Sequence, residues 1–429
     1  MLSRISNTLS WAAIAAVFVF LIMPAFVFAA AKEKILLNFN GTDGGGSEAG
    51  LIFDQAGNLY GTAGGGGSYG DGTVFELSPG ANGQWTVTVL HSFDDNGSDG
   101  SQPLAPVVFD KSGNLYGTTS LGGIFGGFGW GTVFELSPGA NGQWTETVLH
   151  SFNDNGSDGA APYAGVVLDA AGNLYGATVS GGNATACGDE GCGTIYELTP
   201  GANGQWTEKI LYNFNGKDGA NPYAALIFDN SGNLYGTTVN AAFGDGRGTV
   251  FELTPGSDGK WTHRVLYTFG EGTDGRGPFA GVVFGAKGTL FTSTSGGGAN
   301  EYGAVVELMR GSHGKWKDKV LHSFNNNGVD GTYPTATPIL DHAGNLYGTT
   351  FMGGSAGCTG QFGRCGIVFK LRPGAKGTWT ETVLHRFLPN GVDGLGPHDS
   401  LVFDQKGNLY GTTGAGGMYD AGEIFEIVP

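Results

Sequence analysis

Side chains with the chemistry to bind a cation recur at fixed points of this 429-residue chain. An Asp-Gly pair follows strand D in each of the seven repeats, and the oxygen-rich segments 94–100 and 153–159 have the residue types that coordinate calcium. Neither segment has the Glu that ends an EF-hand loop, and Lys217 replaces an acid in another copy. We interpret the pairs as structural turns; calcium stays open at one or two copies and is not predicted. The aspartates are Asp43, Asp99, Asp158, Asp218, Asp274, Asp330 and Asp393.

Residues that could transfer protons also recur, which argues against a catalytic role for them. One position of the repeat alternates between His and Tyr, as expected where packing accepts either ring. Its members are His91, His150, Tyr212, Tyr267, His322 and His385. The chain has neither the phosphate-binding loop with Gly-Lys-Ser/Thr nor a His-Glu-x-x-His motif. The sequence therefore predicts no catalytic residue, no metal site and no cofactor.

The four cysteines form two local pairs, Cys187 with Cys192 and Cys358 with Cys365. In an oxidising compartment such pairs close loops as disulfides. Zinc binding is not expected, because no His lies in or beside either loop.

The first 31 residues have the layout of a secretory signal peptide. Arg4 precedes an apolar run over residues 11–28, and Ala29, Ala30 and Ala31 follow it. The alternative is an uncleaved membrane anchor. After cleavage we expect no transmembrane segment, and a secreted, extracellular or periplasmic protein that could associate with the cell surface. The formal net charge of −17 would repel phosphate backbones, so nucleic-acid binding is not expected.

A long internal repeat organises the rest of the chain. Gly-Asn-Leu-Tyr-Gly begins at six positions, and a degenerate copy at Gly288 makes the seventh; successive copies lie 56 to 63 residues apart. The six are Gly57, Gly113, Gly172, Gly232, Gly344 and Gly407. An Asp-x-x-Gly-Asn hairpin turn joins strand A to strand B. Strands C and D follow, and strand D alternates apolar and hydroxyl residues as a half-buried strand does.

Four-stranded units of this length match the blades of a propeller. We therefore predict an all-β fold: a single domain over residues 32–429, built as a seven-bladed β-propeller of four-stranded antiparallel blades. The last repeat has strand C at residues 422–427 but no strand D, whereas residues 34–39 read as an unattached strand D. We expect this N-terminal strand to complete the seventh blade and close the ring.

The repeated Gly-Asn-Leu-Tyr-Gly-Thr-Thr, the Gly-Gly loop, the Gly-Thr-Val-Phe-Glu-Leu strand and the Phe-x-x-x-x-Asp-Gly ending together resemble a known family. The chain is similar to the bacterial GloVer tandem-repeat proteins, the choice-of-anchor group, over residues 33 to 429. The resemblance implies a secreted or surface repeat protein and brings no molecular activity with it. This chain departs from the group in having no recognisable C-terminal anchor.

In a propeller, the B-to-C loops and the D-to-A connectors share one face. These segments vary from repeat to repeat while the hairpin turns do not, and variable loops on a constant scaffold are where recognition is usually carried. An aromatic-lined channel mouth with one His and one Glu would suit a small ligand or glycan; alternatively, the rings only plug the channel. The candidate ligand-binding residues are Tyr163, Tyr223, Phe279, His398, Glu48, Phe128, Trp130 and Tyr302.

We predict a non-catalytic, monomeric binding protein that uses this variable face to hold a glycan or a protein. The alternative is a carbohydrate-active hydrolase or lyase with His398, Asp399, Glu48 and Tyr163 at the channel mouth.

Overall fold

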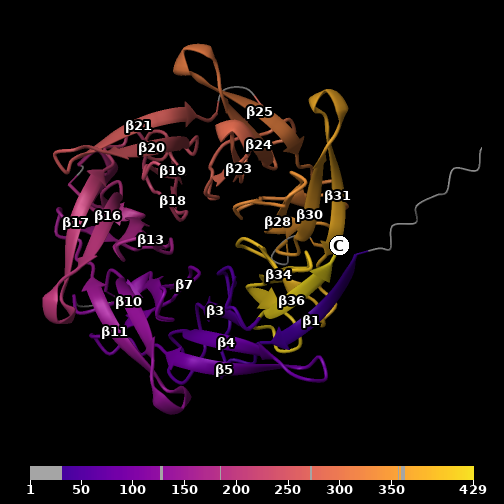
Figure 1. Cartoon of the computed structure of the whole chain (residues 1–429). Coiled ribbons are helices and arrows are strands. Elements are labelled where there is room, and N and C mark those ends of the chain that lie inside the picture. The colour runs from indigo at the N-terminus through magenta and orange to yellow at the C-terminus, as the bar shows by residue number, and fades with distance from the viewer. Residues whose placement is uncertain (1–30, 126–128, 184, 271–272, 356, 359–362) are drawn as a thin grey trace, which may run out of the picture. The chain divides into compact units, whose positions relative to one another are not determined.

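Each repeat folds into one four-stranded antiparallel sheet, and seven such sheets surround a central axis (Figure 1). The computed structural model describes residues 31–429 except 126–128, 184, 271–272, 356 and 359–362. The prediction of an all-β, seven-bladed propeller is confirmed. Within each blade the strands run A, B, C and D from the axis outwards.

The blades have the following strands. Blade 1 contains β2 (Ile52–Phe53), β3 (Leu59–Ala63), β4 (Thr73–Pro79) and β5 (Trp85–Ser92). Blade 2 contains β7 (Val108–Phe109), β8 (Leu115–Thr119), β10 (Thr132–Pro138) and β11 (Trp144–Ser151). Blade 3 contains β13 (Val167–Leu168), β14 (Leu174–Thr178), β16 (Thr194–Pro200) and β17 (Trp206–Asn213). Blade 4 contains β18 (Ile227–Phe228), β19 (Leu234–Thr238), β20 (Thr249–Pro255) and β21 (Trp261–Thr268).

The remaining blades continue the pattern. Blade 5 contains β22 (Val283–Phe284), β23 (Leu290–Thr294), β24 (Ala304–Arg310) and β25 (Trp316–Ser323). Blade 6 contains β27 (Ile339–Leu340), β28 (Leu346–Thr350), β30 (Ile367–Pro373) and β31 (Trp379–Arg386). Blade 7 contains β33 (Val402–Phe403), β34 (Leu409–Thr412), β36 (Glu423–Val428) and β1 (Lys32–Asn38).

Short elements lie in the connections between the strands. Two-stranded ribbons pair β6 (Gly100–Ser101) with β9 (Leu121–Gly122), β12 (Gly159–Ala160) with β15 (Ser180–Gly181), β26 (Gly331–Thr332) with β29 (Met352–Gly353), and β32 (Gly394–Leu395) with β35 (Ala415–Gly416). The 3-10 turns are η1 (Ala140–Gly142), η2 (Thr185–Glu190), η3 (Ala202–Gly204), η4 (Ala286–Gly288), η5 (Ser312–Gly314) and η7 (Ala375–Gly377). No helix among the described residues has the length and apolar character needed to cross a membrane.

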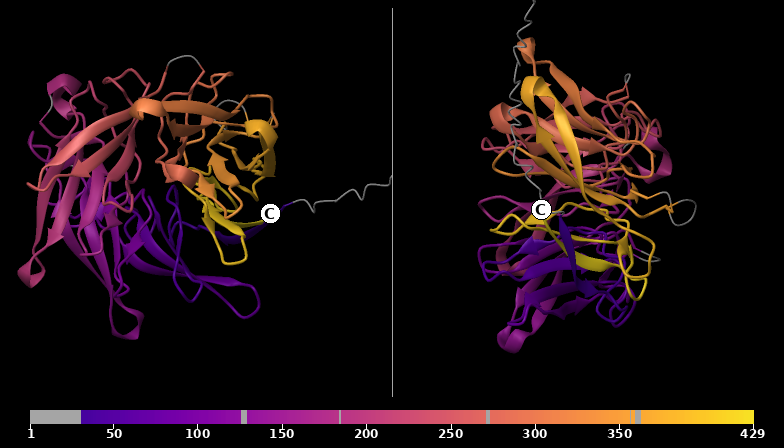
Figure 2. Two further views of the ribbon diagram at one scale, coloured as in Figure 1. Left: turned by 45° about the horizontal axis from the view of Figure 1, so that its top comes forward. Right: turned by 90° about the vertical axis from the view of Figure 1, so that its right-hand side faces the viewer.

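The N-terminal strand closes the ring, as predicted. Strand β1 pairs antiparallel with β36, with Lys32 opposite Val428 and Asn38 opposite Glu423. In Figures 1 and 2 the indigo β1 lies against the yellow β36. The outer edge of β36, which the last repeat leaves without a strand D, is therefore paired by β1.

The hydrophobic core is divided among the seven blade interfaces. Each interface has one buried cluster with members from both neighbouring blades, and the Phe that follows each strand D is fully buried in it. At the interface of blades 1 and 2, the ring centroids of Phe93 and Phe134 are 5.2 Å apart in an edge-to-face contact. The blades thus bury their apolar faces against each other rather than within themselves.

The glycine inside strand B is required by side-chain packing within its own blade. In blade 4, a Cβ on Gly236 would lie 2.6 Å from the ring of Phe251, its partner on strand C. Blade 5 shows the compensating pair, with Thr292 opposite Val306. The glycine therefore makes room for an aromatic ring of the same blade.

Candidate ligand-binding site

The hairpin turns between strands A and B show why one face of the propeller is uniform. In blade 1, Asp54 Oδ1 accepts hydrogen bonds from the backbone N–H groups of Ala56 and Asn58, each at 2.8 Å, and Gly57 adopts a φ of 90°. The predicted turn chemistry is confirmed. In blade 6, burial raises the pKa of the equivalent Asp341, but the hydrogen bonds from Asn345, Tyr347 and Ala343 outweigh it and lower that pKa.

The opposite face carries the exposed apolar side chains. Among the described residues, every large hydrophobic side chain that is strongly exposed lies on a B-to-C loop or a D-to-A connector, except Val428. Examples are Tyr69, Phe243 and Tyr419, which are 61%, 47% and 59% exposed. The exposed apolar side chains of the described residues therefore concentrate on the variable face.

Each D-to-A connector is held rigidly before it reaches the axis. In blade 3, the N–H of Ala161 donates to the carbonyl of Trp130 in the preceding loop, and the carbonyl of Ala161 accepts from Val179. Pro162 follows, and its ring packs on Gly131, where a Cβ would lie 2.6 Å from the Pro Cδ. The residue after the proline therefore projects from a fixed backbone.

These seven post-proline positions meet around one axial cavity of about 370 Å³. At this position the seven repeats place in the lining, in blade order, Glu48, Leu104, Tyr163, Tyr223, Phe279, Thr335 and His398. In the first repeat Ser47 stands where the other six have proline, and its hydroxyl donates to the carbonyl of Thr62 at 2.8 Å. The cavity has the size of a small-ligand site.

Blades 3, 4 and 5 give the cavity an aromatic wall. The ring centroids of Tyr163 and Tyr223 are 5.3 Å apart, and those of Tyr223 and Phe279 are 5.0 Å apart, with both pairs tilted. Burial raises the pKa of the Tyr223 hydroxyl, so it stays a neutral hydrogen-bonding group. These three rings form a continuous apolar arc.

Blades 7 and 1 place polar groups across the ring from that arc. Asp399 is fixed by the N–H of Gly50, which donates to its Oδ2 at 2.8 Å, and by the N–H of Ser400, which donates to its Oδ1 at 2.6 Å. The Thr335 hydroxyl donates to the carbonyl of His398 at 3.0 Å. With Glu48, the cavity has an acidic side opposite its aromatic side.

The structure brings five of the eight predicted ligand-binding residues together at this cavity: Tyr163, Tyr223, Phe279, His398 and Glu48. Phe128 lies outside the described residues. Trp130 is 42% exposed on its B-to-C loop, outside the cavity lining. Tyr302 packs partly buried against the core between blades 5 and 6. That any of the eight binds a ligand stays a prediction.

Both disulfides form as predicted, between Cys187 and Cys192 and between Cys358 and Cys365. Both lie in B-to-C loops of the variable face.

The histidines of strand D do more than pack. His91 Nε2 lies 3.1 Å from Asp99 Oδ2, and Glu146 of the next blade lies close to both side chains. Sequence reasoning missed this grouping, because its members belong to two repeats.

The fold and the cavity define a seven-bladed β-propeller with an axial pocket on its variable face. The chain belongs to the Gloeobacter/Verrucomicrobia repeat family, whose model matches residues 25–186, 125–362 and 244–429. No curated protein matches the chain.

Among solved structures, the chain is similar to the extracellular domain of a candidate one-component system from B. thetaiotaomicron. The two are 14% identical with a TM-score of 0.52 over 92% of this chain, which spans 42% of the other. A candidate 6-phosphogluconolactonase from Bacteroides uniformis is 14% identical, with a TM-score of 0.47 over 78% of this chain and 83% of its own. A candidate glucose dehydrogenase from Thermus thermophilus is 16% identical, with a TM-score of 0.43 over 93% of this chain and all of its own. At these identities the likeness concerns the fold alone.

Proposed function

We propose that this chain is an exported binding protein that holds a carbohydrate in the axial cavity. The observation that carries the proposal is the pairing of the aromatic arc at Tyr163, Tyr223 and Phe279 with the acidic side at Glu48 and Asp399. The C–H faces of a sugar stack on aromatic rings, while its hydroxyls donate to carboxylates.

The fixed connectors suit a binding site. A fixed backbone lowers the ordering cost of association, and the same scaffold presents a different side chain in each blade. The exposed apolar loops around the cavity, including Trp130 and Tyr419, would widen the contact to a longer chain.

Export of the chain is part of the proposal. Two disulfides fit an oxidising compartment, and residues 1–31 would be the signal peptide removed from a propeller of residues 32–429. The Gly-Asn-Leu-Tyr-Gly-Thr-Thr motifs support placement in the choice-of-anchor group.

Titration calorimetry with the hexaoses of cellulose, xylan, chitin and amylose tests the proposal. We expect at least one to bind and Tyr223→Ala to weaken it about tenfold, the loss of roughly 1.4 kcal/mol from one aromatic stacking contact. His313→Ala is the control, since His313 is exposed in the turn between β24 and β25, on the uniform face, and its loss should leave binding unchanged. Absence of binding by all four hexaoses, or equal binding by Tyr223→Ala and the parent, would refute it.

A further inference from the structure

A His, an Asp and a Glu meet at three of the seven blade interfaces. The His lies near the end of one strand D, the Asp belongs to the Asp-Gly pair after it, and the Glu is the third residue of strand D in the next blade. Their ligating atoms all lie within 4.8 Å of one another. The groups are His91, Asp99 and Glu146; His150, Asp158 and Glu208; and His322, Asp330 and Glu381.

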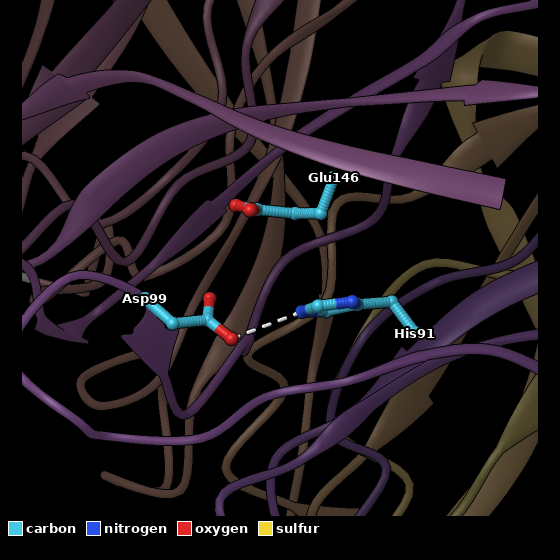
Figure 3. A group of neighbouring side chains, drawn as sticks. All are labelled: His91, Asp99 and Glu146. Carbon is cyan, nitrogen blue, oxygen red and sulfur yellow. Dashed lines mark hydrogen bonds and ion pairs between the residues drawn. The ribbon is translucent and has the colours of Figure 1, made fainter.

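The separations within these groups match those of ligands around one metal ion. The Nε2 atom of His150 lies 3.3 Å from Asp158 Oδ2 and 3.7 Å from Glu208 Oε1. The group at His322 repeats both distances. Ligands at 2.0–2.1 Å around a tetrahedral ion are about 3.4 Å from each other. Figure 3 shows the group at His91, with the Glu146 carboxylate beside the other two side chains.

One carboxylate oxygen of each glutamate in these groups accepts no hydrogen bond from the described part of the chain. Oε1 of Glu146, Glu208 and Glu381 is buried and accepts no hydrogen bond among the described residues. A buried carboxylate without a partner is costly. A proton on His150 Nε2 can serve only one of the two carboxylates, and Glu208 Oε1 accepts no hydrogen bond from any described residue. A cation between the three side chains would satisfy all of them.

The chain's own repeats show that the Glu depends on the His. At all four interfaces with a His in strand D, the next blade supplies Glu; the fourth pairs His385 with Glu33 at 3.3 Å. The other three interfaces have no Glu there. They pair Tyr212 with His263, Tyr267 with Asp318, and Leu37 with Val87.

The Asp occurs at all seven interfaces, so it has a role of its own in the turn. Tyr can serve that Asp as well as His can: the Tyr267 hydroxyl donates to Asp274 Oδ2 at 2.7 Å. Hydrogen bonding to the Asp therefore explains either ring but leaves the Glu unexplained. Unlike Tyr, a neutral His has a nitrogen lone pair, and imidazole is the commonest metal ligand in proteins.

The geometry points to a divalent transition-metal site, of the class that zinc fills, at each of the three interfaces 91/99/146, 150/158/208 and 322/330/381. One imidazole nitrogen and two carboxylate oxygens suit zinc better than calcium or magnesium, which prefer oxygen ligands throughout. The His91 side chain is 21% exposed, so a water can occupy the fourth position. Each ion would tie two neighbouring blades together.

Titration of the EDTA-treated full chain with zinc chloride, by calorimetry and by thermal unfolding, tests this inference. We expect about three zinc ions per chain and a rise in melting temperature that calcium chloride does not reproduce. His150→Tyr copies the side chain that two other interfaces use, so it should fold and reduce the stoichiometry to two. The triple variant H91Y/H150Y/H322Y should bind none.

His313→Ala is the matched control, because His313 is exposed in the turn between β24 and β25 and should leave three ions bound. If the groups are plain ion pairs, the zinc titration will give no heat of binding and zinc will not change the melting temperature. The inference is then wrong. Equal zinc binding by the triple variant and the parent would also overturn it.

Discussion

Glu423→Gln should stabilise the propeller, and increasingly so as the pH rises. Glu423 begins β36 and is fully buried, and neither of its carboxylate oxygens has a hydrogen-bond partner of normal geometry. Two carboxylates face it, Glu33 on β1 and Asp393 in the connector before blade 7. His385 on β31 lies beside them, 3.3 Å from Glu33 Oε1. Burial, with the neighbouring carboxylates, raises the pKa of Glu423 to about 8.

The magnitude follows from linkage. Between pH 4.5 and about 8 the folded chain keeps this proton and the unfolded chain loses it. Stability therefore falls by up to about 1.4 kcal/mol per pH unit as pH rises through this range. Gln has the same shape and no charge to bury. Its advantage should be near zero at pH 4.5, about 3 kcal/mol at pH 7 and about 5 kcal/mol at pH 9.

Urea unfolding of the two proteins at pH 4.5, 7 and 9 measures the difference directly. Glu190→Gln is the matched control, since Glu190 is exposed and its replacement should give no trend with pH. A difference between Glu423→Gln and the parent that stays constant with pH, or a variant less stable than the parent at pH 9, would refute the reasoning.

Three further perturbations test the architecture. A circular permutant that joins Pro429 to Ala31 through Gly-Ala-Asn-Gly-Gln, with a new start at residue 41, should fold with an unchanged melting temperature; an insoluble product would contradict the observed closure. Gly236→Ala should cost about 1–3 kcal/mol in urea unfolding through overpacking against Phe251, and Phe251→Val should recover part of it; additive losses in the double variant would count against the pairing. Asp229→Ala removes hydrogen bonds that lower the pKa of this carboxyl, so it should cost about 1–2 kcal/mol at pH 7. That loss should shrink as pH falls below 4, and a loss independent of pH would rule out the carboxylate's role.

The sequence predicts the fold well because the same pattern of strands and turns recurs in seven copies. The Asp-x-x-Gly-Asn turn, the alternation in strand D and the missing last strand together fix the blades and their closure. The post-proline positions at the cavity could also be predicted from the sequence, since the ring places equivalent residues around one axis. Trp130 and Tyr302 lie on B-to-C loops, as the repeat predicts. How far their rings are exposed was not predictable, because a loop that varies in length has no fixed position relative to the axis.

The His-Asp-Glu groups at the blade interfaces could not be predicted from the sequence, for a different reason. His150 and Glu208 are distant in the sequence and occupy different positions of the repeat, and stacking of two blades brings them together. A signal was present, since Glu at the third position of strand D follows His in the preceding repeat. Reading it requires knowing that neighbouring repeats pack strand D against strand D.

The cavity residues vary between repeats although the backbone that carries them does not. The backbone before each is fixed by hydrogen bonds and, in six blades, by a proline, so the side chain after it can be Leu, Tyr, Phe, Thr or His without altering the blade. Glu48 extends this freedom to a charge, in the blade where Ser47 replaces the proline. These side chains can therefore be exchanged one blade at a time, and under the proposed function each exchange would change which carbohydrate the cavity holds.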